Sequence, residues 1–297
     1  MRDKIVVATD LSPKSDIALQ KAIEISKKYD LWLEVIHVIN PPLFEWVWGS
    51  EILEENQERG KLLQTKAKEI SDKIGSELKR KHNKTHVTIK IGNPSEEIIA
   101  FAKAIKASAI ILGDVGEYHS LEETVLGTTT TNVIDRSNIP ILIARNSDSI
   151  EYKKILIPTN FSDDSKENIK YVAELFPDAK LYLLNVMEIP LDFRLKMYGL
   201  DDKEIENLKE VYVLKNQNAF DIFIKSLDID NDIEKVIALG SVKARMILKE
   251  GRDLSVDLIA LNAHKIDNIT SRIIGNIATH IIKQSKRDVL VYQVKHE

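Results

Sequence analysis

Apolar residues along this chain fall into short runs that alternate with longer amphipathic stretches. In the first half, five runs rich in valine, isoleucine and leucine are typical of buried strands. The segments between them carry apolar residues every three or four positions, as helices packed on a sheet do. The predicted strands are residues 4–9, 31–39, 86–91, 107–112 and 139–144, and the predicted helices begin near residues 13, 51, 94 and 128. This alternation predicts an α/β fold with a parallel, doubly wound sheet.

The same plan begins again from Tyr152, because several marks of the first half recur about 148 to 150 residues later. The recurring marks are Asp10-Leu11-Ser12 with Asn160-Phe161-Ser162, Gly92 with Gly240, Gly127 with Gly275, and Ser137 with Ser285. Two copies of one fold therefore stand in tandem. The predicted domains are residues 1–146 and 147–297, with a short polar linker at residues 146–151.

Composition narrows the class of protein. A chain of 297 residues with 43% apolar content can bury two cores, and the absence of cysteine excludes disulfides and thiolate chemistry. The formal charge of −4 disfavours a nucleic-acid partner, and the seven histidines show no metal-ligand spacing. No apolar run approaches a membrane span, and the first strand is too short for a signal peptide, so we expect a cytoplasmic protein without membrane contact.

Glycines mark the place where a ligand is expected. Gly113 and Gly116 follow the fourth predicted strand, and Gly127 precedes a run of threonines, residues 128–131, that opens a helix. Open α/β sheets bind ligands at the carboxyl ends of strands, and helix N-termini favour anions. The pattern indicates a nucleotide site, although turn glycines and N-capping threonines occur in ordinary loops too.

Asp10 joins this site by topology. If the strand order is 3-2-1-4-5, the switch point lies between strands one and four, which places Asp10 opposite Gly113. A carboxylate repels phosphate but accepts a hydrogen bond from a ribose hydroxyl or a base amino group. The alternative role for Asp10 is to cap the helix that begins at Pro13.

Taken together, these motifs resemble a tandem universal stress protein, with two universal stress protein domains in one chain. The resemblance rests on an aspartate after strand one, His37-Val38 at the end of strand two, and glycines close to the family pattern G-x2-G-x9-G-[ST]. It implies two five-stranded sheets of order 3-2-1-4-5, of the adenine-nucleotide alpha-hydrolase-like kind. It also implies ATP at the switch point and dimers joined through strand five. Whether magnesium accompanies the ATP is left open.

The resemblance assigns roles to eight residues of the first domain. Asp10 would take the adenine end and Val38 would offer backbone contacts to the base, while glycines and threonines would line the ribose and phosphates. These lining residues are Gly113, Gly116, Gly127, Thr128, Thr129 and Thr130. One departure is that ten residues, rather than nine, separate Gly116 from Gly127. Asp114 is the one carboxylate in the loop that could hold magnesium, with a solvated turn aspartate as the alternative.

The second domain departs further from the ATP motif. Asn262 and Lys265 stand where the early glycines should be, Ile277 and Ala278 replace threonines, and Asn160 replaces the aspartate. We expect this domain to bind ATP weakly or not at all.

These residues favour a nucleotide-responsive regulator or scaffold in the stress response, binding an adenine nucleotide in the first domain. No catalytic or metal-ligating residues are assigned, since the chain lacks a G-x-x-x-x-G-K-[ST] loop. Slow ATP hydrolysis stays open. One alternative is an adenylating or nucleotidyl-transfer enzyme, but the Asp10-Leu11-Ser12-Pro13 stretch lacks the phosphate-loop signature of such enzymes. The other is a scaffold that binds an apolar ligand, for which Trp46 and Trp48 are the candidate contacts.

Tandem duplication also bears on assembly. If the fifth strands of the two copies, residues 139–144 and 288–294, pair edge to edge, the chain forms within itself the dimer that single-domain relatives form between chains. Further homodimerisation is left open by this arrangement.

Overall fold

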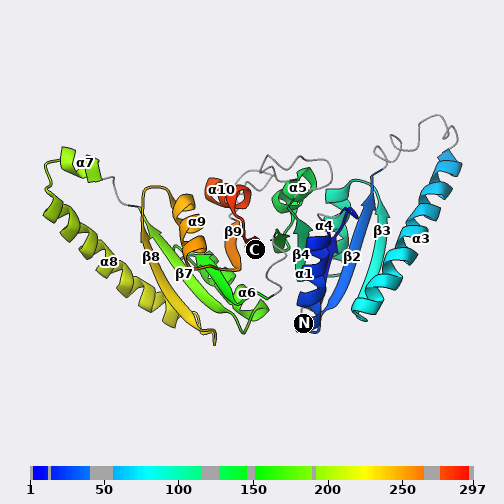
Figure 1. The fold of residues 1–297 in the computed structure, drawn as a ribbon, viewed down its shortest axis with the longest axis horizontal. Coiled ribbons are helices and arrows are strands. Elements are labelled where there is room, and N and C mark those ends of the chain that lie inside the picture. The colour runs from blue at the N-terminus through cyan, green and yellow to red at the C-terminus, as the bar shows by residue number, and fades with distance from the viewer. Residues whose placement is uncertain are drawn as a thin grey trace. The chain divides into compact units, whose positions relative to one another are not determined.

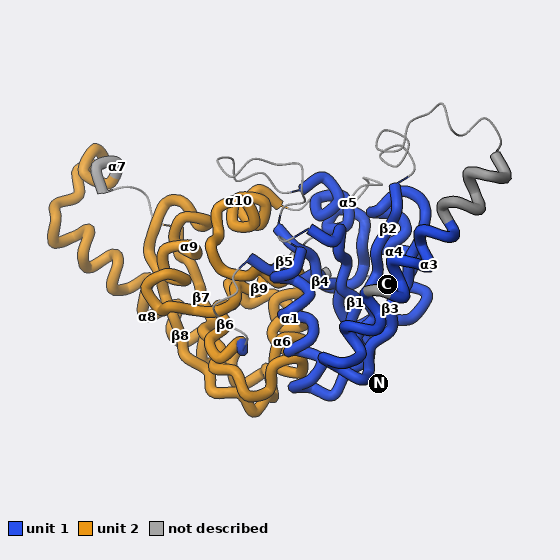
Figure 2. Tube along the Cα trace, turned by 45° about the vertical axis from the view of Figure 1, so that its right-hand side comes forward, with its two compact units in different colours: residues 1–151, 266–273 blue, residues 152–265, 274–297 orange. Residues whose placement is uncertain are grey.

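The computed structural model describes residues 3–12, 15–40, 56–114, 127–145, 151–188, 192–263 and 275–293. The chain divides into two compact units: unit 1 comprises residues 1–151 and 266–273, and unit 2 comprises residues 152–265 and 274–297 (Figure 2). Trp46, Trp48 and Gly116 lie outside the described residues. No helix among the described residues is long and apolar enough to cross a membrane.

Unit 1 alternates strands and helices from end to end (Figure 1). Its elements are β1 (Lys4–Ala8), α1 (Ser15–Lys28), β2 (Trp32–Ile39), α3 (Asn56–Lys81), β3 (Thr85–Ile91), α4 (Pro94–Ala104), β4 (Ala109–Gly113), α5 (Thr128–Arg136) and β5 (Ile141–Ala144). All five predicted strands of this half are present, because each apolar run is long enough to cross a buried sheet. The predicted helix start near residue 51 lies outside the described residues.

Unit 2 repeats the plan, and between β7 and α8 it contains a short helix, α7, that the periodicity did not predict. Its elements are β6 (Lys154–Pro158), α6 (Asp163–Leu175), β7 (Lys180–Met187), α7 (Asp192–Met197), α8 (Asp202–Lys225), β8 (Ile233–Leu239), α9 (Lys243–Asp253), β9 (Leu258–Ala263), α10 (Asn276–Gln284) and β10 (Asp288–Gln293).

Strand order confirms the predicted topology in each unit. The order is β3-β2-β1-β4-β5 in unit 1 and β8-β7-β6-β9-β10 in unit 2, and the strand pairs within each unit are parallel. Both correspond to 3-2-1-4-5. The direction of travel therefore reverses between β1 and β4 in unit 1, and right-handed crossovers place α1 and α3 on one face of the sheet and α4 and α5 on the other. The switch point opens at the carboxyl ends of β1 and β4.

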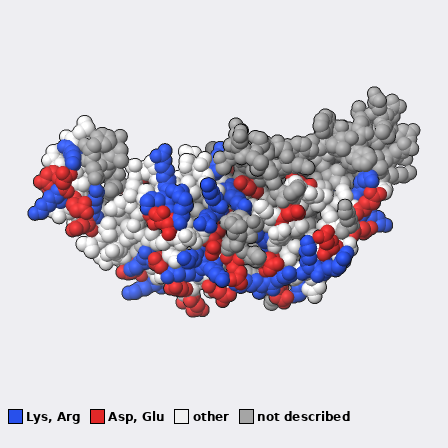
Figure 3. All heavy atoms as spheres, in the orientation of Figure 1, with Lys and Arg blue, Asp and Glu red and all other residues white. Residues whose placement is uncertain are grey.

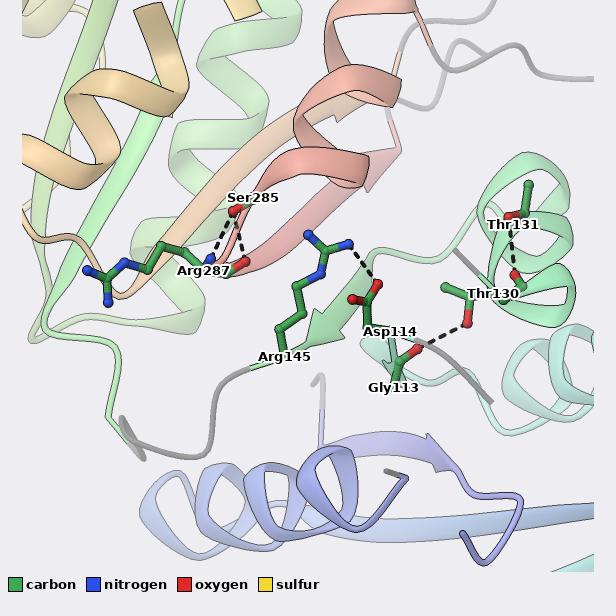
Figure 4. Close-up of polar contacts among 8 residues, drawn as sticks. Gly113, Asp114, Thr130, Thr131, Arg145, Ser285 and Arg287 are labelled. Carbon is green, nitrogen blue, oxygen red and sulfur yellow. Dashed lines mark hydrogen bonds and ion pairs between the residues drawn. The ribbon is translucent and has the colours of Figure 1, made fainter. Parts of the chain in front are cut away.

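Matching local bonds show that the two units are repeats at the level of single residues. Ser137 follows α5, where its hydroxyl donates to Ile139 O (3.1 Å) and accepts from Ile139 N (2.9 Å). Ser285 follows α10 and makes the same two bonds with Arg287, at 2.9 and 3.0 Å (Figure 4). The recurrence of Ser137 and Ser285 in the sequence thus reflects one shared turn between the last helix and the last strand.

Candidate functional site: the switch point of unit 1

The turn after β1 holds Asp10 through its own hydrogen bonds. Its Oδ1 atom accepts from the backbone N (3.0 Å) and the hydroxyl (2.6 Å) of Ser12, and Thr9 Oγ1 accepts from Leu11 N (3.0 Å). Leu11 adopts a φ of 66°, which fixes a tight turn. Asp10 itself is exposed. One oxygen of its carboxylate therefore holds this turn, and the side chain lies exposed beside the end of β1.

His37 ties the neighbouring strand to the same turn. Its Nδ1 lies 2.9 Å from Thr9 O. A carbonyl oxygen only accepts, so the proton must be on Nδ1. This bond fixes the carboxyl end of β2 against the residue that precedes Asp10.

Val38 offers backbone groups beyond the end of the β1–β2 pairing. The paired register ends at Ala8 and Ile36, where Thr9 N donates to Ile36 O (3.0 Å). Because a strand repeats every two residues, the peptide groups of Val38 point to the same side as those of Ile36, past the last β1 partner. On the other side, β2 stays paired with β3 as far as Ile39. Val38 is thus placed for backbone contacts at the switch point.

The first glycine of the motif ends β4, and the residue after it forms an ion pair. Arg145 follows β5, and its Nη2 donates to Asp114 Oδ1 (2.8 Å) while only 7% of its side chain is exposed (Figure 4). Gly113 and Ala144 are register partners, which brings the two charged residues side by side. One oxygen of the Asp114 carboxylate is thus engaged by Arg145, and the Asp114 side chain is 31% exposed. Among the described residues, no group of three or more His, Cys, Asp and Glu side chains is arranged to hold a metal.

The second part of the motif begins α5. Gly127 is its N-cap, and Gly127 N donates to Asp114 O (3.1 Å), so the two ends of the glycine loop meet beside β4. The Thr130 hydroxyl donates to Gly113 O (3.1 Å) and the Thr131 hydroxyl to Gly127 O (3.1 Å), as Figure 4 shows. The extra residue relative to the family pattern falls between Asp114 and Gly127 and leaves these ends in contact.

The first turn of α5 is polarised toward an anion. Its first N–H groups have no carbonyl partner within the helix, as at any helix start, and the N-cap residue, Gly127, has no side chain to cap them. Thr128 is exposed and Thr129 is half-buried, whereas Thr130 is buried. Of the three predicted phosphate-facing threonines, Thr130 uses its hydroxyl proton on Gly113, while Thr128 and Thr129 lie at the surface.

The structure brings together most of the predicted site residues and adds others. Asp10, Val38, Gly113 and the start of α5 all lie at the carboxyl end of one sheet, on or beside the strands that flank the switch point. Gly116 belongs to residues 115–126, which lie outside the described part of the chain. Sequence reasoning missed Arg145. The signal that could have found it is its position directly after strand five, level with Gly113.

Unit 2 keeps the turn and changes the chemistry around it. Asn160 Oδ1 accepts from Ser162 N (3.2 Å) and the Ser162 hydroxyl (2.7 Å), and Phe161 has a φ of 65°. The bond of His37 is replaced by Asn185, whose Nδ2 donates to Thr159 O (2.8 Å). The turn geometry is therefore independent of the acid at its centre.

Aromatic packing covers the turn of unit 2. The ring of Phe161 lies 4.9 Å from that of Phe220 and 5.3 Å from that of Phe223, both buried on α8. In unit 1 the equivalent Leu11 is 43% exposed. Beyond the turn, Ala278 stands where unit 1 has Thr130 and cannot make the hydroxyl bond to the end of the fourth strand.

A doubly wound α/β unit with a polarised switch point is typical of proteins that bind nucleotides or related small molecules. The comparisons with known proteins are more specific. The sequence profile of the universal stress protein family matches residues 1–145 and again residues 151–293. The chain therefore belongs to the universal stress protein family and carries two of its domains in tandem.

Individual relatives agree with this assignment. Universal stress protein MJ0531 of Methanocaldococcus jannaschii is 33% identical over 150 residues, which is 48% of this chain and 81% of the relative. Universal stress protein MJ0577 of the same organism is 32% identical over 162 residues, covering 50% of this chain and 99% of the relative. A crystal structure of a universal stress protein from Archaeoglobus fulgidus covers 99% of both chains with a TM-score of 0.67 and 17% identity, which supports the tandem fold.

Proposed function

We propose that unit 1 binds an adenine nucleotide, ATP foremost, and that the chain acts as a nucleotide-responsive regulator in the stress response. The observation that carries the proposal is that three chemically different groups lie at the carboxyl end of one sheet. These are the exposed Asp10 carboxylate, the backbone of Val38 beyond its last β1 partner, and the Gly127-capped start of α5. A hydrogen-bond acceptor, unpaired backbone groups and a helix N-terminus that favours anions are together suited to the base, sugar and phosphates of a nucleotide.

Each group supplies a different part of the recognition. Asp10 accepts from a ribose hydroxyl or the adenine amino group, and the Val38 peptide pairs with the edge of the base. The N–H groups at the start of α5, with the hydroxyls of Thr128 and Thr129, donate to phosphate oxygens. Gly113 and Gly127 keep side chains away from the path of the ligand.

Magnesium, where present, would be held by the phosphates themselves and by water. Asp114, the loop carboxylate nearest the site, is engaged by Arg145 at 2.8 Å. The described residues of unit 1 thus fit a nucleotide better than they fit a protein-bound metal.

Calorimetric titration of the full chain with ATP, ADP and AMP, each with and without magnesium, tests the proposal. Asp10→Asn is the sharpest variant, because Asn160 of unit 2 already makes the same two turn bonds with an amide oxygen. The turn should survive while the charged acceptor is lost. We expect at least about tenfold weaker binding, since a hydrogen bond to a charged group contributes about 1.5–3 kcal/mol.

Asn160→Ala is the matched control, because it alters the same position of unit 2 and should leave affinity and stoichiometry unchanged. One nucleotide per chain, weakened only by Asp10→Asn, supports the proposal. No binding at millimolar ATP, or binding that Asn160→Ala removes and Asp10→Asn does not, would overturn it.

A further inference from the structure

Helix α8 of unit 2 carries an apolar stripe that its own unit does not cover. Its buried side, which includes Ile205, Phe220 and Phe223, packs inside unit 2. Five apolar side chains of the same helix are exposed: Leu208 at 36%, Val211 at 62%, Tyr212 at 50%, Leu214 at 61% and Ile222 at 72%. Leu208, Val211 and Ile222 lie along one side of the helix and form the stripe. Exposed apolar surface of this kind on a helix commonly marks a contact with another protein surface.

The spacing of the stripe is that of a helix–helix seam. Glu204, Leu208, Val211, Lys215 and Ile222 follow one another at steps of four, three, four and seven residues. These steps keep all five on one side of a helix, as the seam positions of a coiled coil are. Leu208 and Val211 thus sit between an acidic residue on the N-terminal side and a basic residue on the C-terminal side.

Charge is distributed unevenly along α8. Its N-cap and first two turns contain four acidic residues, Asp201, Asp202, Glu204 and Glu206, against one basic residue, Lys203. The second half contains two basic residues, Lys215 and Lys225, against one acidic residue, Asp221. A helix with this distribution is complementary to a second copy of itself placed antiparallel. Figure 3 shows acidic and basic side chains close together over α8, not a surface of one sign. A lipid-binding helix, in contrast, is usually rich in lysine and arginine on its polar face.

We propose that α8 is a homodimerisation surface, on which two copies of the chain pack their α8 helices antiparallel across a two-fold axis. Leu208 of one protomer meets Val211 of its partner, and the reverse contact forms on the other side of the axis, as a two-fold interface requires. Four residues farther out in each direction, Glu204 then faces Lys215 of the partner, because both pairs are symmetric about one point.

Charge also selects this register over its main competitor. An antiparallel pairing that matches Leu208 with Ile222 would place Lys215 against the Lys215 of the partner on the axis. Like charges in direct contact are destabilising. The register centred between Leu208 and Val211 instead pairs opposite charges twice and buries four apolar side chains at its centre.

Sedimentation equilibrium of the full chain over a concentration series tests the interface. We expect a reversible dimer. Val211→Glu should weaken it at least about tenfold, and because Val211 is 62% exposed, the folded protomer should be unaffected. Lys215→Glu should weaken it similarly by opposing Glu204. Circular dichroism melts at dilutions where the wild type is monomeric check that each variant folds.

A second substitution provides the rescue. Glu204 closes the capping box of α8, where its Oε2 accepts from Asp201 N (2.9 Å), and glutamine can make the same bond. Glu204→Gln added to Lys215→Glu should therefore remove the repulsion without uncapping the helix and restore most of the affinity. Lys203→Glu, an exposed charge reversal off the stripe, is the control and should leave dimerisation unchanged. A wild type that stays monomeric at 0.1 mM or so, or a dimer insensitive to both Val211→Glu and Lys215→Glu, would overturn the proposal.

Discussion

Asp114 and Arg145 form a short ion pair directly beside the first glycine of the candidate site, and the consequence for a phosphate ligand is electrostatic. An unpaired carboxylate at this place would repel phosphates, while the largely buried guanidinium offsets its charge. Arg145→Met should therefore weaken ATP binding by roughly tenfold, and Asp114→Asn combined with Arg145→Met should recover most of it. Calorimetric titration of the two single variants and the double variant measures the coupling.

Arg136 supplies the control for this cycle. It also forms an ion pair, with Glu96 at 3.2 Å, but both side chains are exposed and lie at the far end of α5. Arg136→Met should leave ATP affinity unchanged. If the double variant binds no better than Arg145→Met alone, Arg145 acts by some means other than neutralising Asp114.

At the residue scale, the sequence singled out Asp10 as a candidate site residue but did not show how it is held. A strand followed by Asp-Leu-Ser indicates a turn, yet the bonds of Ser12 and the positive φ of Leu11 emerge only from the folded chain. Arg145 was hidden for a different reason. Its partner lies 31 residues away, and only the register of β4 with β5 brings them together. The placement of Gly116 stays a prediction.

At the scale of elements, a buried bond joins the start of unit 2 to its last strand. The Tyr152 hydroxyl, just before β6, donates to Oδ2 of Asp288, the first residue of β10, at 2.6 Å. Burial raises the pKa of Tyr152 well above its usual value, and the nearby charge of Asp288 raises it further. Because the folded chain holds this proton more tightly than the unfolded chain does, the contribution is complete below about pH 10 and is lost as the pH rises beyond it.

Tyr152→Phe should accordingly lower the free energy of unfolding by about 1–3 kcal/mol at pH 7, since it leaves the buried Asp288 without this donor. The variant should also lose less stability than the wild type between pH 9 and about pH 11. Urea unfolding followed across this pH range measures both effects. Tyr198→Phe, at an exposed position of unit 2, should change neither. Equal alkaline slopes for wild type and Tyr152→Phe would contradict the assignment.

Elements were predictable wherever burial on a sheet dictated the pattern. The strands of unit 1 are short apolar runs covered on both faces, so their type followed from composition and alternation. Their order was expected only from the family resemblance. Helix α8 shows where that reasoning ends. Its apolar residues occupy both a buried side and an exposed stripe, and periodicity alone cannot tell which side packs inside the unit.

For the whole molecule, duplication predicts a one-sided response to ligand. Unit 1 keeps the glycines and threonines of the ATP motif. In unit 2, Phe161 packs on α8 and Ala278 replaces the threonine that corresponds to Thr130. Hydrogen exchange with and without saturating ATP should show added protection near residues 8–12, 36–40 and 127–131. The corresponding parts of unit 2, near residues 158–162 and 275–279, should not change. Equal protection of both units would show two working sites.

The shared turn after the first strand of each unit bears on how the two halves could diverge. Its bonds need only an oxygen at Asp10 or Asn160 and a serine two residues later, so either side chain satisfies them. After a gene duplication, an exchange of aspartate for asparagine would have been nearly neutral for folding even if it ended ligand binding. Selection for folding and selection for ligand binding therefore act separately at this position. Asn160→Asp would be a small step in directed evolution of a second binding site.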